Sequence, residues 1–364
     1  MDIPVHKKKI AFLIPSLQPG GMERVMSEII EFCSRKPEVE LHLVLFGIKR
    51  EIFYEIPKNI LIHKPDFEFD NTKRSWHTLK TIYFIRKTIK KINPNTVLSF
   101  GELWNNLVLL ALLNTPYSVF VSDRCQPNKS IGKLHDFLRK KLYKNAAGII
   151  AQTSIAKSIY QNGIVKSTNI KVIGNPIAQQ ELVTTPREKI VLSVGRLIET
   201  KHHDELIKLF VKLNKPDWKL IIVGGDALKQ NNSKVLNDLI KSLNAQGRVI
   251  LAGNQKDVTS YYKKSSIFAF TSSSEGFPNV VGEALSFGLP VVAFDCIAGP
   301  SDMIQDSKNG NLIKLFDYEQ FAKKLGLLMD DEALRLKMAE FAPISIRKFD
   351  KNKIGEEYYE FIAY

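Results

Sequence analysis

Two glutamates, eight residues apart, mark the stretch whose residue types are best suited to chemistry. Residues 271–292 read TSSSEGFPNVVGEALSFGLPVV and contain Glu275 and Glu283. A strand is expected to end at Thr271, and Pro278 suits the first turn of a helix. The backbone N–H groups of Asn279, Val280 and Val281 would then lack helical partners and could bind a phosphate. Carboxylates accept hydrogen bonds from neighbouring hydroxyls, so the pair indicates sugar contacts, although such acids are also common on helix surfaces.

A second loop combines a glycine with two cations. The expected strand 190–194 runs into GRLIETK, which places Gly195, Arg196 and Lys201 in one strand-to-helix loop. A guanidinium and an ammonium directed at one point neutralise a diphosphate without a metal ion. The competing interpretation is a solvated basic loop.

The first loop of the chain, PSLQPGGMER at 15–24, holds Gly20 and Gly21 between a strand and a helix. Glycine lets backbone amides approach an anion, and the helix N-terminus adds favourable partial charge. The loop lacks the G-x-G-x-x-G spacing of dinucleotide folds and the Gly-Lys-Ser/Thr ending of a P-loop, so it supports neither nicotinamide nor NTPase chemistry. A simple tight turn is the alternative.

Short apolar runs that alternate with helical patterns must position these loops. Such runs indicate parallel sheets covered on both faces, in which ligands bind beyond the carboxyl ends of the strands. The polar segment after Ile173, with two prolines, predicts a linker between two α/β domains that face each other across a cleft. The predicted organisation is a first domain over 1–174, a linker over 175–189, a second domain over 190–345 and a C-terminal helix over 346–364. The expected strands are 10–14, 41–46, 96–100, 117–121, 148–151, 190–194, 218–223, 249–252, 267–271 and 290–294.

The composition is that of a folded protein with an uneven charge. Of 364 residues, 44% are hydrophobic and 25% charged, which excludes a disordered or collagen-like chain. Residues 1–180 hold 27 Lys and Arg against 14 Asp and Glu, a net charge of +13, whereas residues 181–364 hold 25 against 24. The first half therefore predicts an anionic partner, for which a nucleic acid, a lipid surface and a phosphorylated substrate are the candidates.

Cysteine usage and hydropathy predict a cytoplasmic protein. Cys33, Cys125 and Cys296 are odd in number and far apart, as in a reducing compartment. The apolar run 10–15 is too short for a signal peptide, and the longest later run, 107–113, falls short of the roughly 20 residues of a membrane span. Any membrane contact is therefore expected to be peripheral.

Two basic amphipathic helices are expected in the first half, over 73–91 and 133–144. Either could pack its apolar face on the core or lay it on an anionic membrane. The second helix follows the loop of Asp123 and Arg124 directly, so it is the candidate for membrane contact. Its apolar residues are Leu134, Phe137, Leu138 and Leu142, and its flanking cations are Lys133, Arg139, Lys140, Lys141 and Lys144.

The segment EGFPNVVGE resembles the E-x7-E motif of the retaining family four glycosyltransferases. The resemblance covers nearly the whole chain, because the two glycine loops described above also fit it. Further matching segments are GGD at 224–226, LAGNQKDV at 251–258 and DCIAGPSDMI at 295–304. The resemblance implies a GT-B fold of two Rossmann-like domains around a cleft, with a C-terminal helix that crosses back to the first domain.

The resemblance also implies roles for individual residues. Arg196 and Lys201 would hold the donor diphosphate, and Glu275 the donor sugar, as the catalytic set. Many relatives carry a Glu-His pair after the fifth strand, whereas this chain has Ser122-Asp123-Arg124, so only a place near the acceptor is expected for Asp123 and Arg124. In the donor-binding set implied by the resemblance, Gly253 and Asn254 lie near the base, and Glu283 binds the ribose. The other members of the set are Gly20, Gly21, Gly195, Phe277, Pro278, Asn279 and Val280.

The expected activity is transfer of a hexose or N-acetylhexosamine, with retention, from a nucleoside-diphosphate donor such as a UDP-sugar. The expected acceptor is a glycan on polyprenyl diphosphate in bacterial surface glycan synthesis, met at the inner face of an anionic membrane. No metal-ligand spacing appears, so neither a metal nor another cofactor is expected. Because no nucleic-acid motif is present, no nucleic-acid partner is expected. The alternatives are a sugar-nucleotide epimerase of the same fold and a non-catalytic basic protein that binds membrane or RNA without turnover.

Overall fold

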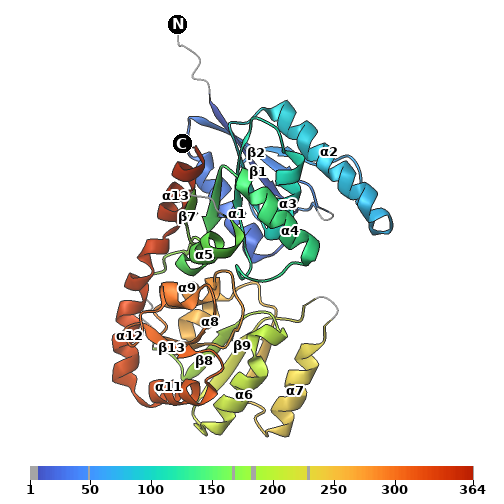
Figure 1. Cartoon of the computed structure of the whole chain (residues 1–364). Helices are drawn as coiled ribbons and strands as arrows, with labels where there is room; N and C mark the ends of the chain where they lie inside the picture. The colour runs from blue at the N-terminus through green and yellow to red at the C-terminus, as the bar shows by residue number, and fades with distance from the viewer. Residues whose placement is uncertain (1–6, 48–49, 166–168, 182–185, 228–229, 364) are drawn as a thin grey trace. The chain divides into compact units, whose positions relative to one another are not determined.

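The structure is a computed structural model that describes residues 7–47, 50–165, 169–181, 186–227 and 230–363. The chain divides into two compact units, unit 1 with residues 1–176 and 351–364, and unit 2 with residues 177–350 (Figure 1). Unit 2 begins earlier than the predicted second domain because the Ile177 amide donates to the Phe349 carbonyl at 2.7 Å and so joins the end of that unit. Of the predicted linker, residues 182–185 lie outside the described residues.

Unit 1 is built on a seven-stranded parallel sheet in the order β3-β2-β1-β4-β5-β6-β7. Its strands are β1 (Lys8–Ile14), β2 (Val39–Leu45), β3 (Leu61–His63), β4 (Thr96–Phe100), β5 (Ser118–Ser122), β6 (Gly148–Ala151) and β7 (Ile170–Val172). The central strands are buried on both faces, which explains their continuous apolar runs.

Helices cover both faces of the unit 1 sheet. One face packs against α2, α3, α4 and α5, and its core holds Val97 of β4 with Ile85 and Ile89 of α2. The other face packs against α1 and α13, where the Thr96 hydroxyl donates to the Ile362 carbonyl at 2.7 Å. The C-terminal helix α13 thus belongs to unit 1. These helices are α1 (Gly21–Ser34), α2 (Arg74–Ile92), α3 (Glu102–Ala111), α4 (Lys133–Leu142), α5 (Ser154–Ile159) and α13 (Lys351–Ala363).

Unit 2 repeats the design with a six-stranded parallel sheet in the order β10-β9-β8-β11-β12-β13. Its strands are β8 (Ile190–Val194), β9 (Lys219–Val223), β10 (Val249–Gly253), β11 (Ile267–Phe270), β12 (Val291–Asp295) and β13 (Gly310–Lys314). Its core packs α6, α7, α11 and α12 on one face, while α8 and α9 lie against the other. These helices, with α10, are α6 (His203–Lys212), α7 (Asn232–Ser242), α8 (Thr259–Lys264), α9 (Asn279–Ser286), α10 (Pro300–Met303), α11 (Tyr318–Asp330) and α12 (Glu332–Ser345).

Both sheets have the order of a doubly wound fold, so the predicted pair of Rossmann-like domains is confirmed. Each predicted strand is present within two residues of its expected ends. Three strands escaped prediction, namely β3, β7 and β13. β3 and β7 are three residues long, and β13 reads GNLIK, so none of them carries a long apolar run.

No helix in the described ranges is both long and apolar enough to cross a membrane.

Candidate functional site

The residues of unit 2 that were predicted to bind a donor lie in loops at the carboxyl edge of its sheet. The strand order reverses between β8 and β11, which are neighbours in the sheet. In doubly wound folds, ligands bind at such a reversal. The loop after β8 carries Gly195, Arg196 and Lys201, and the loop after β11 carries Glu275, so the topology brings the two loops together.

The Lys201 ammonium and the Glu275 carboxylate form an ion pair between these loops. Lys201 Nζ lies 2.5 Å from Glu275 Oε1, and the two side chains are only 17% and 15% exposed. The ammonium also lies 5.4 Å from the centre of the Phe270 ring. Nearby, burial raises the pKa of the Cys296 thiol to about 12, with Glu275 acting in the same direction, so this thiol stays protonated.

Backbone and hydroxyl contacts lock the two loops to each other. The Ser273 amide donates to the Thr200 carbonyl at 2.8 Å, and the Thr271 hydroxyl donates to the Lys201 carbonyl at 2.7 Å. The His202 ring adds a contact of 2.9 Å from Nε2 to the Ser273 hydroxyl. Lys201 and Glu275 are therefore held on a fixed frame, which favours an arrangement that is preorganised for a ligand.

Glycine is required where the β8 and β9 loops touch. Gly224 has a φ of +147°, and a Cβ there would lie 1.9 Å from the Gly195 carbonyl oxygen. A Cβ on Gly195 would itself press on the Lys201 side chain, 3.3 Å from Cε. Beside this close approach Arg196 is exposed, and it has no ion-pair partner within the described part of the chain. An exposed guanidinium next to a fixed ammonium suits an anionic ligand.

Gly253 and Asn254 join the same edge from β10. Gly253 has a φ of +67°, and its carbonyl accepts from the Gly224 amide at 2.9 Å. A Cβ on Gly225 would lie 2.6 Å from the Asn254 amide nitrogen, so the GGD turn and Asn254 are in contact. The structure thus brings this pair next to the Gly195 loop.

The start of α9 differs from the sequence prediction. The helix begins at Asn279, with Pro278 as the capping residue before it rather than inside the first turn. The expectation of three unbonded amides was wrong for two of them, since Asn279 donates to the Phe277 carbonyl at 3.0 Å and Val281 to the Pro278 carbonyl at 2.9 Å. The tight turn around Pro278 uses these groups, whereas the Val280 amide has no backbone partner among the described residues.

Two aromatic residues around this helix organise the site. Phe277 is buried, with its ring edge-on to Phe349 at 5.3 Å. The Tyr262 hydroxyl donates to Glu283 Oε2 at 3.0 Å, and the buried Tyr262 ring stacks on Phe287. Sequence reasoning missed Tyr262, because nothing in the stretch YYKK distinguishes it from a surface helix.

In unit 1 the Gly20-Gly21 loop is held by Tyr54 and Glu23. The Tyr54 hydroxyl donates to the Gly20 carbonyl at 2.9 Å. The Glu23 carboxylate folds back over the start of α1, so that a Cβ on Gly20 would lie 2.2 Å from Glu23 Oε2. Burial raises the pKa of the Glu23 carboxyl. An anion that approaches this helix N-terminus would therefore meet a carboxylate of the chain itself.

Asp123 lies in a buried network after β5. Its carboxylate accepts from Arg139 and from the Tyr143 hydroxyl, and from the Asn105 side chain at 3.0 Å. The Asp123 side chain has no exposed surface, and that of Arg139 is 4% exposed. Burial opposes the charge of Arg139, yet Asp123 raises the pKa of this guanidinium. The Asp123 carboxylate is thus held inside unit 1, and its place near an acceptor stays a prediction.

Arg124 is equally engaged inside unit 1. It donates to the Asn175 side chain at 2.8 Å and to the Tyr358 hydroxyl of α13 at 2.9 Å, and its guanidinium lies 3.4 Å from the centre of the Phe100 ring. Burial lowers the pKa of this guanidinium. The backbone amide of Arg124 donates to the Glu102 carboxylate at 2.8 Å. These contacts tie the loop after β5 to the C-terminal helix.

The structure corrects part of the prediction for helix α4, the candidate for membrane contact. Leu134 and Phe137 are 65% and 56% exposed, so they are not core residues, whereas Leu142 is buried. Arg139, expected among the outward cations, is buried because it pairs with Asp123. Within the described ranges, no group of three or more His, Cys, Asp or Glu side chains is gathered as a metal site.

Comparisons with known proteins agree with this fold. The family model "Glycosyl transferases group 1" matches residues 175–344. An uncharacterized glycosyltransferase of Haemophilus influenzae is 29% identical over 96% of this chain and 99% of its own length. Another relative, 28% identical over 96% of this chain and 98% of its own, is the Campylobacter jejuni N-acetylgalactosamine-N,N'-diacetylbacillosaminyl-diphospho-undecaprenol 4-alpha-N-acetylgalactosaminyltransferase. Anabaena HepE, solved with UDP and glucose, superposes with a TM-score of 0.81 at 19% identity, covering 97% of this chain and 98% of its own.

These findings define the chain as a glycosyltransferase of the GT-B fold. Its relatives include enzymes named for the synthesis of bacterial surface polysaccharides. The comparisons favour transfer over the epimerase and the non-catalytic binding protein.

Proposed function

We propose that the chain transfers a hexose or N-acetylhexosamine, with retention, from a UDP-sugar to a glycan carried on polyprenyl diphosphate. The observation that carries the donor half is the ion pair of Lys201 and Glu275 at 2.5 Å, fixed beside Gly195 and the exposed Arg196. Two cations on one frame offset the negative charge of a diphosphate. The relative that acts on a diphospho-undecaprenol substrate supports the acceptor half.

The proposed chemistry depends on charge that develops on the leaving diphosphate. Arg196 and Lys201 would stabilise that charge in the transition state more than in the bound donor, which is what accelerates the reaction. Glu275 accepts from Lys201 through one oxygen, so its second oxygen remains for a hydroxyl of the donor sugar. Glu283, held by Tyr262, would accept from the donor ribose.

We also propose that transfer needs no metal ion, because the two cations supply the positive charge. Addition of EDTA should leave the transfer rate within about twofold of its value without EDTA. A loss of roughly tenfold would mean that the metal lowers the activation free energy by about 1.4 kcal/mol. Strong inhibition that magnesium or manganese reverses would contradict this part of the proposal.

A donor screen tests the activity itself. The purified chain is incubated with single UDP-sugars and a polyprenyl-diphosphate-linked glycan, and the product is followed by mass spectrometry. NMR of the product then reports the anomeric configuration, which retention predicts to be that of the donor. Isomerised donor without acceptor would favour an epimerase, and inversion would overturn the retaining assignment.

Peripheral contact with the inner face of an anionic membrane follows from the same acceptor. Exposed Leu134 and Phe137 lie on α4 with the exposed cations Lys140 and Lys141. Each Lys or Arg near an anionic surface contributes about 1 kcal/mol. We expect flotation with phosphatidylglycerol vesicles at low salt, a clear loss at high salt, and a loss when both lysines become Glu.

A matched pair of lysines on unit 2 provides the control for this flotation test. Changing Lys323 and Lys324 of α11 to Glu alters the net charge by the same amount on a different surface. Equal loss of flotation in both variants would show an effect of net charge alone and would remove α4 from the proposal.

A further inference from the structure

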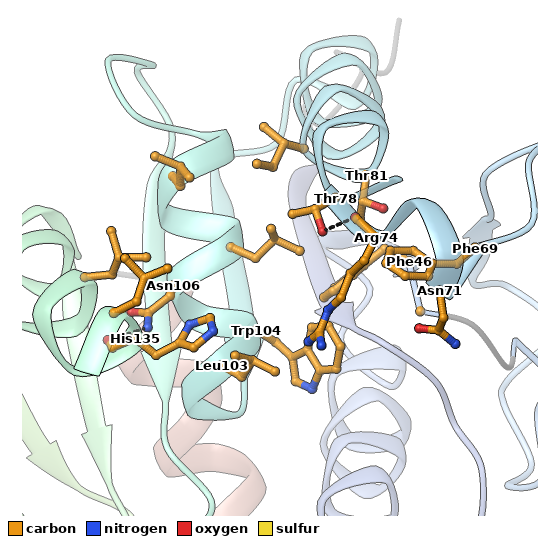
Figure 2. A pocket seen from close by; sticks show the side chains of 16 residues that line it. Phe46, Phe69, Asn71, Arg74, Thr78, Thr81, Leu103, Trp104, Asn106 and His135 are labelled. Carbon is orange, nitrogen blue, oxygen red and sulfur yellow. Dashed lines mark hydrogen bonds between the residues drawn. The ribbon is translucent and has the colours of Figure 1, made fainter. Parts of the chain in front are cut away.

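Unit 1 contains an apolar groove that the donor site does not use. Its volume is about 370 Å³, within the range of small-molecule pockets of about 300–1,000 Å³. Figure 2 shows that α2, α3 and α4 contribute its walls. Its apolar lining includes Ile82, Leu103, Trp104, Leu107, Leu110 and Leu134.

Large apolar side chains continue from the groove onto the surface. Leu134 and Leu110 both line the groove and are 65% and 39% exposed. Exposed apolar side chains that gather in this way mark a binding surface for an apolar partner. The groove is therefore open to a long apolar molecule that extends beyond it.

The charge around the groove points to an anionic end on that molecule. Of the six Lys and Arg residues of α2, Arg74 is the one that lines the groove. Arg74, its first residue, lines the groove and is exposed, and Figure 2 shows its side chain reaching toward Trp104. Among the described lining residues none is acidic. An apolar chain that ends in an anion complements both features.

Two polar atoms in the groove wall give an independent sign of a polar group on the ligand. Asn106 is 2% exposed, and its Oδ1 has no hydrogen-bond partner in the described part of the chain, although its Nδ2 donates to the His135 carbonyl at 2.9 Å. His135 Nδ1 is likewise buried without a partner among the described residues. Buried polar atoms are normally hydrogen-bonded. His135 Nδ1 can donate to an anionic oxygen when it carries the ring proton, whereas the Asn106 oxygen is an acceptor and needs a donor such as water.

We propose that this groove binds the first isoprene units of a polyprenyl-diphosphate acceptor, with Arg74 and His135 facing the diphosphate. The inference rests on the proposed function only for the identity of the lipid. The apolar walls take the hydrocarbon next to the anion, and the exposed side chains of Leu110 and Leu134 face the remainder of the lipid. The groove thereby selects an acceptor by its lipid, separately from the donor site in unit 2.

Farnesyl diphosphate is a soluble probe of this groove. Its binding to the full chain, without donor, is measured by calorimetry and by the fluorescence of Trp104 in the groove wall. We expect saturable binding at least about tenfold tighter than that of inorganic diphosphate or of farnesol, since each carries only half of the recognised chemistry. Arg74→Gln should weaken farnesyl diphosphate and leave farnesol unchanged.

A matched pair on α2 separates the groove from the surface around it. Thr78 lines the groove, whereas its neighbour Leu79 is exposed and does not line it. Thr78→Phe should weaken farnesyl diphosphate by at least about tenfold, while Leu79→Phe should not. Urea unfolding of both variants checks that the fold is kept.

The outcomes distinguish this inference from the proposed function. Binding of farnesyl diphosphate is measured without turnover, so a chain that transfers no sugar can still confirm the groove. Conversely, transfer with an unchanged acceptor KM in Thr78→Phe would keep the transferase and overturn the groove. Two outcomes would show a membrane-facing surface instead of a lipid site. One is that farnesyl diphosphate binds no more tightly than inorganic diphosphate. The other is that Thr78→Phe and Leu79→Phe change vesicle flotation equally and neither changes the binding of farnesyl diphosphate.

Discussion

Replacing Lys201 by Met tests whether the ion pair of unit 2 serves catalysis or only the fold. The change removes an ammonium that lies 2.5 Å from Glu275 Oε1 at 17% exposure and leaves that carboxylate unpaired. A charge-assisted hydrogen bond contributes about 1.5–3 kcal/mol, so the free energy of unfolding should fall by that amount. Loss of one group that stabilises transition-state charge should lower kcat about 10²–10³-fold.

The double variant Lys201→Met/Glu275→Gln separates these two effects. The amide removes the unpaired charge, so the free energy of unfolding should recover in part. The rate should not recover, because the diphosphate still lacks its ammonium. Urea unfolding is followed through Trp218, which is buried in unit 2, after Trp76 and Trp104 are changed to Phe.

The exposed pair of Lys189 and Asp217 provides the control. Its atoms lie 3.2 Å apart, and its side chains are 57% and 71% exposed, so Lys189→Met should change stability by less than about 1 kcal/mol and leave kcat alone. If the double variant regained the wild-type rate together with its stability, Lys201 would act only by holding Glu275, and the catalytic argument would fail. A fully active single variant would refute it outright.

Three further predictions concern other parts of the molecule. Glu283→Gln should raise the KM for the donor about tenfold, and Tyr262→Phe should raise it less, because the phenol only orients the carboxylate; calorimetry with UDP checks both. Arg139→Met should lower the free energy of unfolding by about 3–5 kcal/mol, since it leaves a buried carboxylate unpaired; urea unfolding followed by circular dichroism measures it. Burial lowers the pKa of the His203 imidazole to about 4 from 6.5, so protonation of the unfolded chain should cost about 3 kcal/mol of stability as pH falls from 6.5 to 4. His203→Leu should remove that part of the pH dependence, and an unchanged slope would contradict the assignment.

The sequence predicts the sheets well because their central strands are buried on both faces. Burial on both faces requires nearly continuous apolar residues, which are visible without a structure. Short edge strands such as β3 bury few residues and leave no such run. The carboxyl-edge position of Lys201 and Glu275 also follows from strand order, whereas their 2.5 Å contact does not, because it depends on the turn chemistry of two loops.

Contacts between distant segments explain what the sequence could not show in the site. Tyr262 reaches Glu283 only because α8 and α9 lie on the same face of the sheet. Asp123 and Arg139 are 16 residues apart, and each has the composition of a surface residue until the fold buries them together. The turn at Pro278 used two amides that helix rules alone leave unbonded.

The net charge of the first half overstates what an anionic partner can meet, because its arginines and lysines have different roles. Arg86 donates to two carbonyls at the end of α3, at 2.9 and 3.1 Å, while Arg124 and Arg139 are engaged inside unit 1. A planar guanidinium with five donors can satisfy several fixed acceptors at once, which suits it to such interior positions. The ammonium groups of Lys140 and Lys141 stay at the surface, because a compact and strongly hydrated charge is costly to bury. In the proposed membrane contact of α4, the attraction to anionic lipid would therefore come from Lys140 and Lys141 rather than from Arg139.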